Sequence, residues 1–317
     1  MTQPRDVLIV TAANGAAATG NHCTAQQWAD ILRGLGHRAT VAAAYDGQEA
    51  DVLVALHGVK SRAAVAAFRA ARPGARVVVA LTGTDVYPKP APETIESVRG
   101  ADRVVALQDR VPAMLPPDVR DRVRVIVQSA TAHPPGEIDG GVFDAGVVAH
   151  LRAVKDPLRA AAAARMLPPD SRVRIRHAGA ILEPGYRDLV ARERRENPRY
   201  TWLGELSPAG ARSLMAACAV VVVSAPHEGG ARVIGESLVA GTPVLAARND
   251  AGRSLLGDDY AGFFDAGNTE ALGALLRRAE TDGAFLARLR ERARARAHQF
   301  DPRREVEAWR GLMAELA

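Results

Sequence analysis

The sequence predicts an α/β protein made of two doubly wound, Rossmann-like domains that face each other across a cleft. Its 317 residues suit two domains, since one domain typically has roughly 100–200 residues. Short β-branched runs alternate with longer segments rich in Ala, Leu and Arg, a pattern typical of parallel sheets covered by helices. This alternation stops at Thr131–Gly146, which is rich in proline and glycine, and then starts again, so this stretch is the expected linker.

Each half has its own series of expected strands. In the first half they are Val7–Thr11, Ala39–Ala43, Val52–Leu56, Arg76–Leu81, Val104–Leu107 and Val123–Val127, with helical segments such as Thr24–Leu35 and Ser61–Ala71 between them. In the second half the alternation restarts at Gly146 and continues through Arg172–Arg176, Tyr200–Leu203, Val220–Ser224, Pro243–Ala246 and Gly262–Phe264. We therefore expect domains over residues 1–140 and 141–299, and a C-terminal helix over 300–317 that packs back on the N-terminal domain. Ligands bind outside the carboxyl ends of parallel strands, so two facing sheets would share one site.

Composition and charge argue against a nucleic-acid partner. The hydrophobic content of 48% and charged content of 24% are ordinary for a globular protein. The net charge of +5 is spread along the chain, and the arginine-rich run 288–296 is typical of the solvated face of a helix. We therefore expect no nucleic-acid partner. A dispersed positive charge favours the attraction of small anionic substrates instead.

The chain also carries no sign of a membrane segment or a metal site. Its first residues, MTQPRDVLIV, lack the features of a signal peptide, and no apolar run approaches the roughly 20 residues that span a bilayer. Cys23 and Cys218 do not have the spacing of metal ligands or of a redox pair, and no Asp-x-Asp pair occurs. We expect a cytoplasmic protein that uses no metal and no cofactor.

The clearest chemical pattern lies between Val220 and Ala246. An apolar strand ends at Ser224, the turn Glu228-Gly229-Gly230 follows, and a helix then continues to Ala240. The two glycines allow the backbone to approach a ligand closely, and the N–H groups at the start of the helix form an anion site. This strand, turn and helix predict a place where an anionic ligand binds.

Two glutamates belong to this pattern. Glu228 lies on the turn, whereas Glu236 lies on the helix near Val233 and Val239, in partly apolar surroundings. A carboxylate in such surroundings needs hydrogen-bond donors, and a pair of sugar hydroxyls would supply two. The alternative is that Glu236 pairs with an arginine and that Glu228 is a solvated turn residue.

Together, the Glu-Gly-Gly turn, the second glutamate and the segment Gly241–Ala246 resemble the signature of retaining glycosyltransferases of the GT-B fold, those of family 4 in particular. Further segments match the family along nearly the whole chain: Gly36-His37, Gly83–Asp85, His150–Pro157, His177–Gly179 and Tyr200–Gly204. The resemblance implies an enzyme that takes a sugar from a nucleotide-sugar donor. It also implies that residues 1–140 bind the acceptor and that residues 141–299 bind the donor.

The resemblance further implies a role for individual residues. Arg152 and Lys155 would hold the donor diphosphate, and Glu228 would stabilise positive charge on the anomeric carbon, which makes these three the expected catalytic residues. Fixed cations suit this reaction, because negative charge grows on the leaving phosphate oxygens. Glu236 would accept hydrogen bonds from the ribose hydroxyls. The complete implied nucleotide-sugar site consists of Glu236, Gly229, Gly230, Ala231, His177, Gly179 and Leu203.

One position departs from the family pattern. Where the family commonly has a histidine before Gly-Thr-Asp, this chain has Thr82. His57, at the end of an expected strand, is either a substitute for that histidine or a structural residue. The missing histidine puts a standard hydroxyl acceptor in doubt, because such an acceptor benefits from help in losing its proton.

A narrower resemblance concerns the acceptor. The segments Thr82–Tyr87, Lys155–Arg159, Glu228–Ile234 and Leu255–Phe264 are similar to those of the selenosugar synthases of selenoneine biosynthesis. These enzymes join selenophosphate to a sugar from a UDP-sugar such as UDP-N-acetylglucosamine. An anionic acceptor needs an anion site, and loop N–H groups before the first helix, together with nearby polar residues, could form one. The expected acceptor site consists of Asn14, Gly15, Thr19, Gly20, Asn21, His57, Lys60, Thr82, Gly83 and Asp85.

Other functions remain open from the sequence. The expected loop before the first helix is either an anion site or simply a flexible connection. The protein as a whole could be an ordinary glycosyltransferase with a hydroxyl acceptor, a UDP-sugar epimerase that needs no acceptor, or a non-catalytic nucleotide-sugar binder. Incubation with UDP-N-acetylglucosamine, with and without selenophosphate, distinguishes these functions.

Overall fold

The chain forms two compact units in the computed structural model, which describes residues 3–11, 20–131, 133–134, 136 and 140–317. The first unit contains Met1–Ser129, Glu228–Gly230 and Asp301–Ala317. The second unit contains Ala130–His227 and Ala231–Phe300. The division falls after Ser129, whereas the expected domain boundary lies after residue 140.

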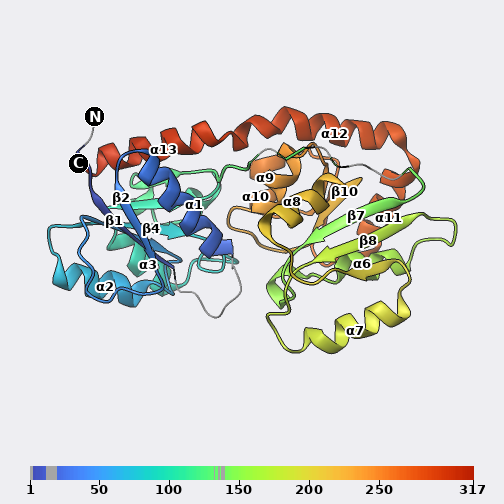
Figure 1. Ribbon diagram of the computed structural model, residues 1–317, viewed down its shortest axis with the longest axis horizontal. Helices are drawn as coiled ribbons and strands as arrows, with labels where there is room; N and C mark the ends of the chain where they lie inside the picture. Colours follow the sequence, from blue (N-terminus) through green and yellow to red (C-terminus); the bar gives the residue numbers. More distant parts are fainter. Residues whose placement is uncertain (1–2, 12–19, 132, 135, 137–139) are drawn as a thin grey trace. The chain divides into compact units, whose positions relative to one another are not determined.

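The sheet of the first unit has six parallel strands in the order β2-β1-β3-β4-β5-β6 (Figure 1). The strands are β1 (Asp6–Thr11), β2 (Arg38–Ala42), β3 (Val52–Leu56), β4 (Arg76–Leu81), β5 (Arg103–Ala106) and β6 (Val123–Val125). Because β1 lies between β2 and β3, the chain winds outward from β1 in both directions, as in a doubly wound fold. Every residue of β3 is buried, which is why this strand is a continuous apolar run without alternation.

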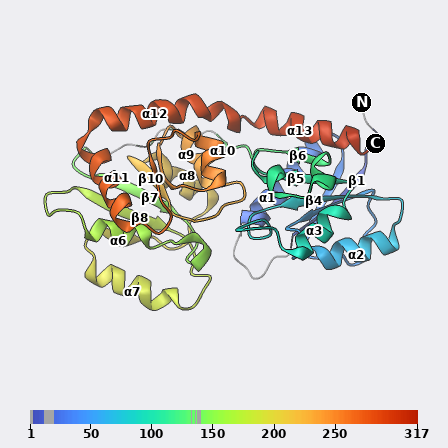
Figure 2. The same cartoon turned by 180° about the vertical axis from the view of Figure 1, so that it is seen from behind.

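Helices cover both faces of this sheet. On one face, α1 (Gly20–Gly34) and α13 (Pro302–Glu315) lie side by side and share one apolar core with alternate residues of the strands (Figure 2). On the other face lie α2 (Arg62–Ala71), α3 (Pro92–Arg99), α4 (Val111–Met114) and α5 (Pro117–Arg120), which form a second core. The C-terminal helix is thus part of the first unit.

The sheet of the second unit also has six parallel strands, in the order β12-β11-β10-β7-β8-β9. The strands are β7 (Phe143–Val148), β8 (Val173–Ala178), β9 (Tyr200–Trp202), β10 (Val220–Val223), β11 (Val244–Ala247) and β12 (Phe263–Phe264). The central pair is β7 and β10, with Val220 opposite Ala145. From this pair the strand order runs outward in both directions, so the second unit is doubly wound as well.

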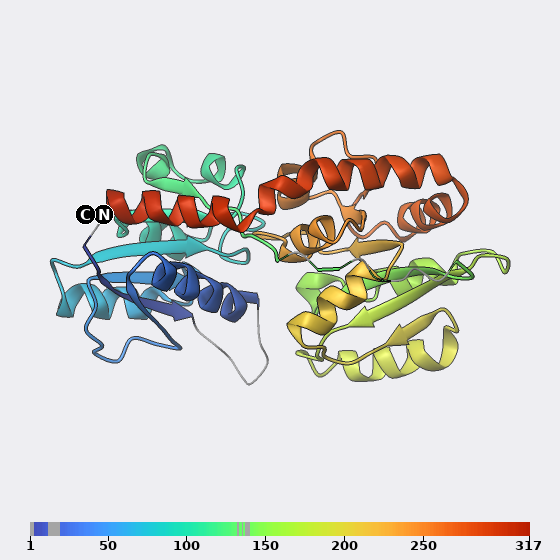
Figure 3. The same cartoon turned by 45° about the horizontal axis from the view of Figure 1, so that its top comes forward.

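Helices also lie on both sides of the second sheet (Figure 3). They are η1 (Ala153–Lys155), α6 (Arg159–Arg165), α7 (Tyr186–Glu196), α8 (Pro208–Ala216), α9 (Arg232–Val239), α10 (Asp250–Leu256), α11 (Thr269–Thr281), α12 (Gly283–Ala297) and η2 (His298–Phe300). Helix α6 packs against α11, while α9 packs against α8 and α12. At Gly235 of α9, a Cβ atom would come within 2.6 Å of the Phe300 ring, so only glycine lets this ring lie against the helix. In the described part of the chain, no helix is long and apolar enough to cross a bilayer.

The predicted fold class of two doubly wound α/β domains is confirmed. The expected strands Val52–Leu56 and Arg76–Leu81 have the predicted bounds. One difference concerns the expected linker Thr131–Gly146, because its last residues already form β7. Gly146 allows close packing there rather than flexibility, since a Cβ atom would lie 3.0 Å from the Cys218 sulfur.

A buried carboxylate holds α13 in the first unit. Glu305 is 1% exposed and accepts hydrogen bonds from the Trp28 indole nitrogen at 2.8 Å, from the Ser129 amide at 2.8 Å and from the Ser129 hydroxyl at 2.6 Å. The Gln27 side-chain amide is a further donor at 2.6 Å. The Trp28 and Trp309 rings meet edge to face, with their centroids 4.9 Å apart. One glutamate therefore links α13, α1 and the last residue of the Met1–Ser129 segment.

We predict that Glu305→Ala lowers the free energy of unfolding by about 3 kcal/mol, because it leaves several buried donors without an acceptor. Chemical denaturation followed by tryptophan fluorescence measures the change. The matched control is Glu307→Ala on the same helix, where the side chain is exposed and pairs with Arg310. Equal stability of the two variants would contradict this role of Glu305.

Candidate functional site

The second unit has its topological switch point between β7 and β10, where ligands of doubly wound sheets bind. The chain leaves β7 into η1 and leaves β10 toward α9. The Ser224 hydroxyl, just after β10, donates a hydrogen bond to the Asp156 carbonyl at 2.7 Å, which ties the two segments together. Asp156 has a left-handed backbone with φ of 44° and pairs with Arg159 at 2.7 Å. The residues around η1 are therefore held firmly at the carboxyl end of the sheet.

Two expected cations, Arg152 and Lys155, lie in this segment. Arg152 precedes η1 and Lys155 ends it, and both are half-buried. The Nε atom of Arg152 is buried, and it has no hydrogen-bond partner among the described residues. A buried charged donor without an acceptor is costly, and an anion at this position would remove the cost. This is the strongest physical indication of an anion site in the second unit.

The start of α9 lies at the same switch point. Its N-cap residue Ala231 has a left-handed backbone with φ of 42°, and no side chain caps the helix. The first N–H groups of a helix need acceptors, and they attract anions when no side chain supplies one. The first turn carries Arg232 and no acidic residue, so the local charge also favours an anion.

The structure places Glu236 on α9, with its side chain 15% exposed. Arg232 Nη2 lies 3.3 Å from Glu236 Oε1, one helical turn away. The pairing of Glu236 with an arginine, which the sequence left open, is therefore present. Sequence reasoning did not single out Arg232, although an arginine in the first turn of a helix, where the macrodipole disfavours a cation, is a usable signal.

Three expected nucleotide-sugar residues have packing roles in the structure. The His177 side chain is fully buried, with Nε2 2.9 Å from the Ala149 carbonyl and Nδ1 2.8 Å from the Tyr200 hydroxyl, so it supports the sheet rather than offering a nitrogen to a ligand. At Gly179, a Cβ atom would lie 1.9 Å from the same carbonyl, which explains the glycine. Leu203 packs against the apolar cluster of Ala178, Leu214 and Cys218.

The turn Glu228–Gly230 belongs to the first unit by its contacts. A Cβ atom at Gly229 would lie 2.2 Å from the Thr82 carbonyl oxygen, and one at Gly230 would lie 2.6 Å from the Gln128 side-chain oxygen. The two glycines thus allow close approach to other protein atoms, whereas the sequence analysis assigned them to the approach of a ligand. The Glu228 side chain is half-buried.

The first unit has its own group of polar residues at the carboxyl ends of β3 and β4. Asp85 is fully buried, and its carboxylate accepts hydrogen bonds from three backbone N–H groups, at Gly58, Thr82 and Gly83. His57 is buried beside it, with Nε2 2.9 Å from the Thr84 hydroxyl oxygen. Asp85 therefore holds the two loops together and has little remaining capacity for a ligand.

The rest of the expected acceptor site is described only in part. Asn14, Gly15 and Thr19 lie outside the described residues. Gly20 begins α1 and is exposed, and the Asn21 side chain donates a hydrogen bond to the Thr82 hydroxyl at 3.2 Å. Lys60 is exposed. Of the expected residues, the structure thus brings Asn21, Thr82, Gly83, Asp85 and His57 together.

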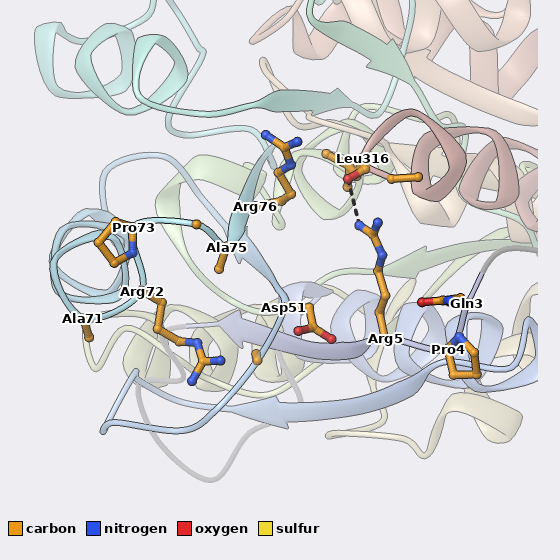
Figure 4. Close-up of a pocket in the computed structure, with 13 residues that line it drawn as sticks. Gln3, Pro4, Arg5, Asp51, Ala71, Arg72, Pro73, Ala75, Arg76 and Leu316 are labelled. Atoms are coloured by element: carbon orange, nitrogen blue, oxygen red, sulfur yellow. Dashed lines mark hydrogen bonds between the residues drawn. The ribbon is translucent and has the colours of Figure 1, made fainter.

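A hollow of about 670 Å³ lies elsewhere on the first unit (Figure 4). Arg5, Asp51 and Arg76 line it, and the Arg5 guanidinium donates a hydrogen bond to the Leu316 carbonyl at 2.8 Å. These residues lie at the amino ends of β1, β3 and β4, whereas ligands of such sheets bind at the carboxyl ends. This hollow therefore lies at the opposite ends of the strands from the expected acceptor site. Within the described residues, no group of His, Cys, Asp and Glu side chains is arranged to hold a metal ion.

Comparison with protein families identifies the class of protein. Residues 129–296, more than half of the chain, match the family "Glycosyl transferases group 1". The chain belongs to this family. The predicted resemblance to glycosyltransferases is thereby confirmed at the level of the family. No curated protein sequence matches the chain.

Solved structures share the fold over nearly the whole chain. HepE of Anabaena, in complex with UDP and glucose, is 16% identical, covers 98% of this chain and 100% of its own, and has a TM-score of 0.73. Sucrose-phosphate synthase of Thermosynechococcus elongatus is 13% identical, covers 98% of this chain and 99% of its own, and has a TM-score of 0.80. A glycosyltransferase of Rickettsia africae is 12% identical, covers 99% of each chain and has a TM-score of 0.74. The chain therefore has the GT-B fold of these proteins.

Burial of His177 predicts an acid-sensitive second unit. Burial lowers the pKa of His177 to about 4, while the unfolded chain retains an ordinary value near 6.5. The unfolded state thus binds more protons between these values, so stability is fully present above pH 6.5 and is lost as the pH falls toward 4.

We predict that this histidine alone lowers the free energy of unfolding by about 2 kcal/mol between pH 8 and pH 5. Denaturation curves at the two pH values should show this loss in the wild type and should lack it in His177→Gln. The exposed His298 supplies the control, since His298→Gln should keep the wild-type response. Parallel pH responses of the wild type and His177→Gln would rule out the buried, neutral histidine.

Proposed function

We propose that this protein is a selenosugar synthase, a glycosyltransferase that transfers the sugar of a UDP-sugar, UDP-N-acetylglucosamine by preference, to selenophosphate in selenoneine biosynthesis. The single observation that carries the donor half of the proposal is the anion site at the switch point of the second unit. There, the buried Arg152 Nε has no acceptor among the described residues, and no side chain caps the start of α9. A nucleoside diphosphate supplies several such oxygens.

The donor is held by the second unit in this proposal. Arg152, Lys155 and the N–H groups at the start of α9 bind the diphosphate. Glu236 accepts hydrogen bonds from the ribose hydroxyls, while its partner Arg232 balances its charge. HepE, with the same fold, binds UDP and UDP-glucose, which supports a uridine nucleotide as the leaving group.

Bond formation follows from this arrangement of charge. A selenium lone pair forms the new bond to the anomeric carbon, the bond from that carbon to the diphosphate oxygen breaks, and its electron pair leaves with UDP. Arg152 and Lys155 stabilise the charge on the leaving oxygen, and Glu228 stabilises positive charge on the sugar. The selenium of selenophosphate carries no proton that a base must remove, so the step balances without a general base.

The acceptor is the more specific half of the proposal. Thr82 stands where related enzymes commonly have a histidine. Its hydroxyl oxygen accepts a hydrogen bond from the Asn21 side chain at 3.2 Å. His57, the histidine at the end of β3, is buried and bonded to Thr84. Because neither Thr82 nor this histidine offers a free base, the arrangement supports a nucleophile that is already an anion.

The deciding experiment incubates the protein with UDP-N-acetylglucosamine, with and without selenophosphate, and analyses the products by mass spectrometry. We expect rapid release of UDP only with selenophosphate, a product with selenium bonded to the sugar, and unchanged turnover in excess EDTA. Transfer to an alcohol but not to selenophosphate would make the protein an ordinary glycosyltransferase. Conversion of the donor alone would indicate an epimerase, and binding without turnover would indicate a non-catalytic protein.

The two glutamates should affect different kinetic constants. We predict that Glu228→Ala lowers kcat about a hundredfold, because it removes charge stabilisation in the transition state. Glu236→Ala should instead raise the KM for the donor about tenfold, because it removes hydrogen bonds made equally in the ground state. Glu291→Ala, an exposed change on α12, is the control. Unchanged kcat and KM in both variants would exclude these roles.

A further inference from the structure

An unusual backbone conformation marks the residue that follows β3. His57 has a φ of 76°, in the left-handed region that favours glycine, and it is one of three such non-glycine residues in the described chain. The strand β3 lies beside β1 at the switch point of the first unit, so His57 stands at the carboxyl edge where a ligand of this sheet would bind. Strained residues of this kind persist where the surrounding structure requires their side chain at one place.

The hydrogen bonds of His57 define where its proton lies. The backbone N–H of Lys60 points to Nδ1 at 3.3 Å, and an amide N–H can only donate, so Nδ1 must carry the lone pair. In the neutral ring the proton is then on Nε2, which donates it to the Thr84 hydroxyl oxygen at 2.9 Å. Burial, the largest influence, lowers the pKa of His57 and favours this neutral form.

The charged groups that face the ring agree with this assignment. Asp85 Oδ2 lies 4.0 Å from Nδ1, but the carboxylate already accepts hydrogen bonds from three backbone N–H groups. The ammonium of Lys60 lies on an exposed side chain. Both ring nitrogens of His57 are therefore engaged within the protein, and the lone pair on Nδ1, which already accepts the Lys60 N–H, is not free to take a proton from an acceptor. His57 is thus not a substitute for the missing histidine base.

The consequence of this arrangement falls on Thr84. Its hydroxyl oxygen accepts the His57 proton, so its own hydrogen must point to another group, and within the described residues of the first unit no such group accepts it. Thr84 is exposed, although Gly83 and Asp85 on either side are buried. A hydroxyl oriented in this way presents a hydrogen-bond donor at the edge of the sheet.

We propose that Thr84 is an acceptor-binding residue, which donates a hydrogen bond to a phosphoryl oxygen of the acceptor, and that His57 is the positioning residue that orients its hydroxyl. This inference rests on the proposed function, because it concerns the acceptor of that reaction. A fixed donor suits an acceptor with anionic oxygens. Gly83 and Asp85, the two expected acceptor residues on either side of Thr84, are buried in the structure, and Thr84 is the residue of the three that reaches solvent.

The test compares Thr84→Val, which removes the hydroxyl at nearly constant shape, with Thr84→Ser, which keeps it. We expect Thr84→Val to raise the KM for selenophosphate about tenfold, as for loss of one hydrogen bond to a charged group, with kcat and the donor KM little changed. The inhibition constant of inorganic phosphate should rise by a similar factor. Thr84→Ser should restore both values to within about threefold of the wild type.

A second variant tests the orienting role of His57. Asparagine tolerates the left-handed backbone but is too short to reach Thr84, so His57→Asn should also raise the acceptor KM. Because the two residues act through one hydrogen bond, the double variant His57→Asn with Thr84→Val should be no worse than Thr84→Val alone. Independent, multiplying effects would overturn the orienting role. Thr40→Val, an exposed change on β2, is the matched control and should behave as the wild type.

The outcome is separable from that of the proposed function. If the wild type uses a different acceptor, the same variants are compared with that acceptor, and an unchanged acceptor KM in Thr84→Val overturns the inference while the glycosyltransferase activity stands. If the wild type transfers no sugar, calorimetry with inorganic phosphate replaces kinetics. Equal phosphate affinity of the wild type and Thr84→Val, or no phosphate binding at all, overturns the inference as well.

Discussion

The order of the strands at the centre of the second sheet is the constraint on which the proposed donor site depends. Inner parallel strands satisfy their backbone groups laterally, so polar groups without a partner can occur only where the chain leaves the sheet. At β7 and β10 the chain leaves toward opposite sides, into η1 and α9. Within the described residues, the buried Arg152 nitrogen has no acceptor and no side chain caps the start of α9. The Ser224 hydroxyl fixes this geometry through one hydrogen bond to the Asp156 carbonyl.

The first unit also has backbone groups that need partners where the chain leaves the sheet, and there a buried carboxylate supplies them. The loops after β3 and β4 are joined by the carboxylate of Asp85, which accepts hydrogen bonds from three backbone N–H groups. A buried carboxylate used in this way is a structural element, because its oxygens are occupied by the loops that it holds. The strain at His57 is a consequence, since Gly58 and Lys60 must both turn their N–H groups inward, toward Asp85 and His57. What remains for a ligand are side chains at the outer surface of the loop, such as Thr84.

Most of the fold could be predicted from the sequence, because fully buried parallel strands are continuous β-branched runs, as Val52–Leu56 shows. Arg152, Lys155 and Glu236 were also expected from the motif, and in the structure they lie at η1 and on α9, the segments that follow the two central strands β7 and β10. The packing roles were not predictable. At Gly146, Gly179 and Gly229 a Cβ atom would come too close to atoms of residues that are distant in the sequence. From the sequence alone, His177 is expected to bind a ligand, because its two hydrogen-bond partners in the core become known only from the structure. Thr84 was missed because its role depends on which nitrogen of His57 carries the proton, and a backbone amide three residues further on decides that.

The two proposed sites differ in the chemical groups that they present to a ligand. The second unit presents cations and N–H groups, which favour departure of a phosphate-type leaving group. The described loops after β3 and β4 present the Thr84 hydroxyl, and His57, the buried histidine beside it, is already a donor to that hydroxyl oxygen. A hydroxyl nucleophile must lose a proton as it attacks, and a site of donors does not remove it. A nucleophile that arrives as an anion needs no such help, and its charged oxygens are what those donors hold in place. In the proposed reaction the nucleophile therefore arrives with its own negative charge, and the Thr84 hydroxyl is a donor that holds it.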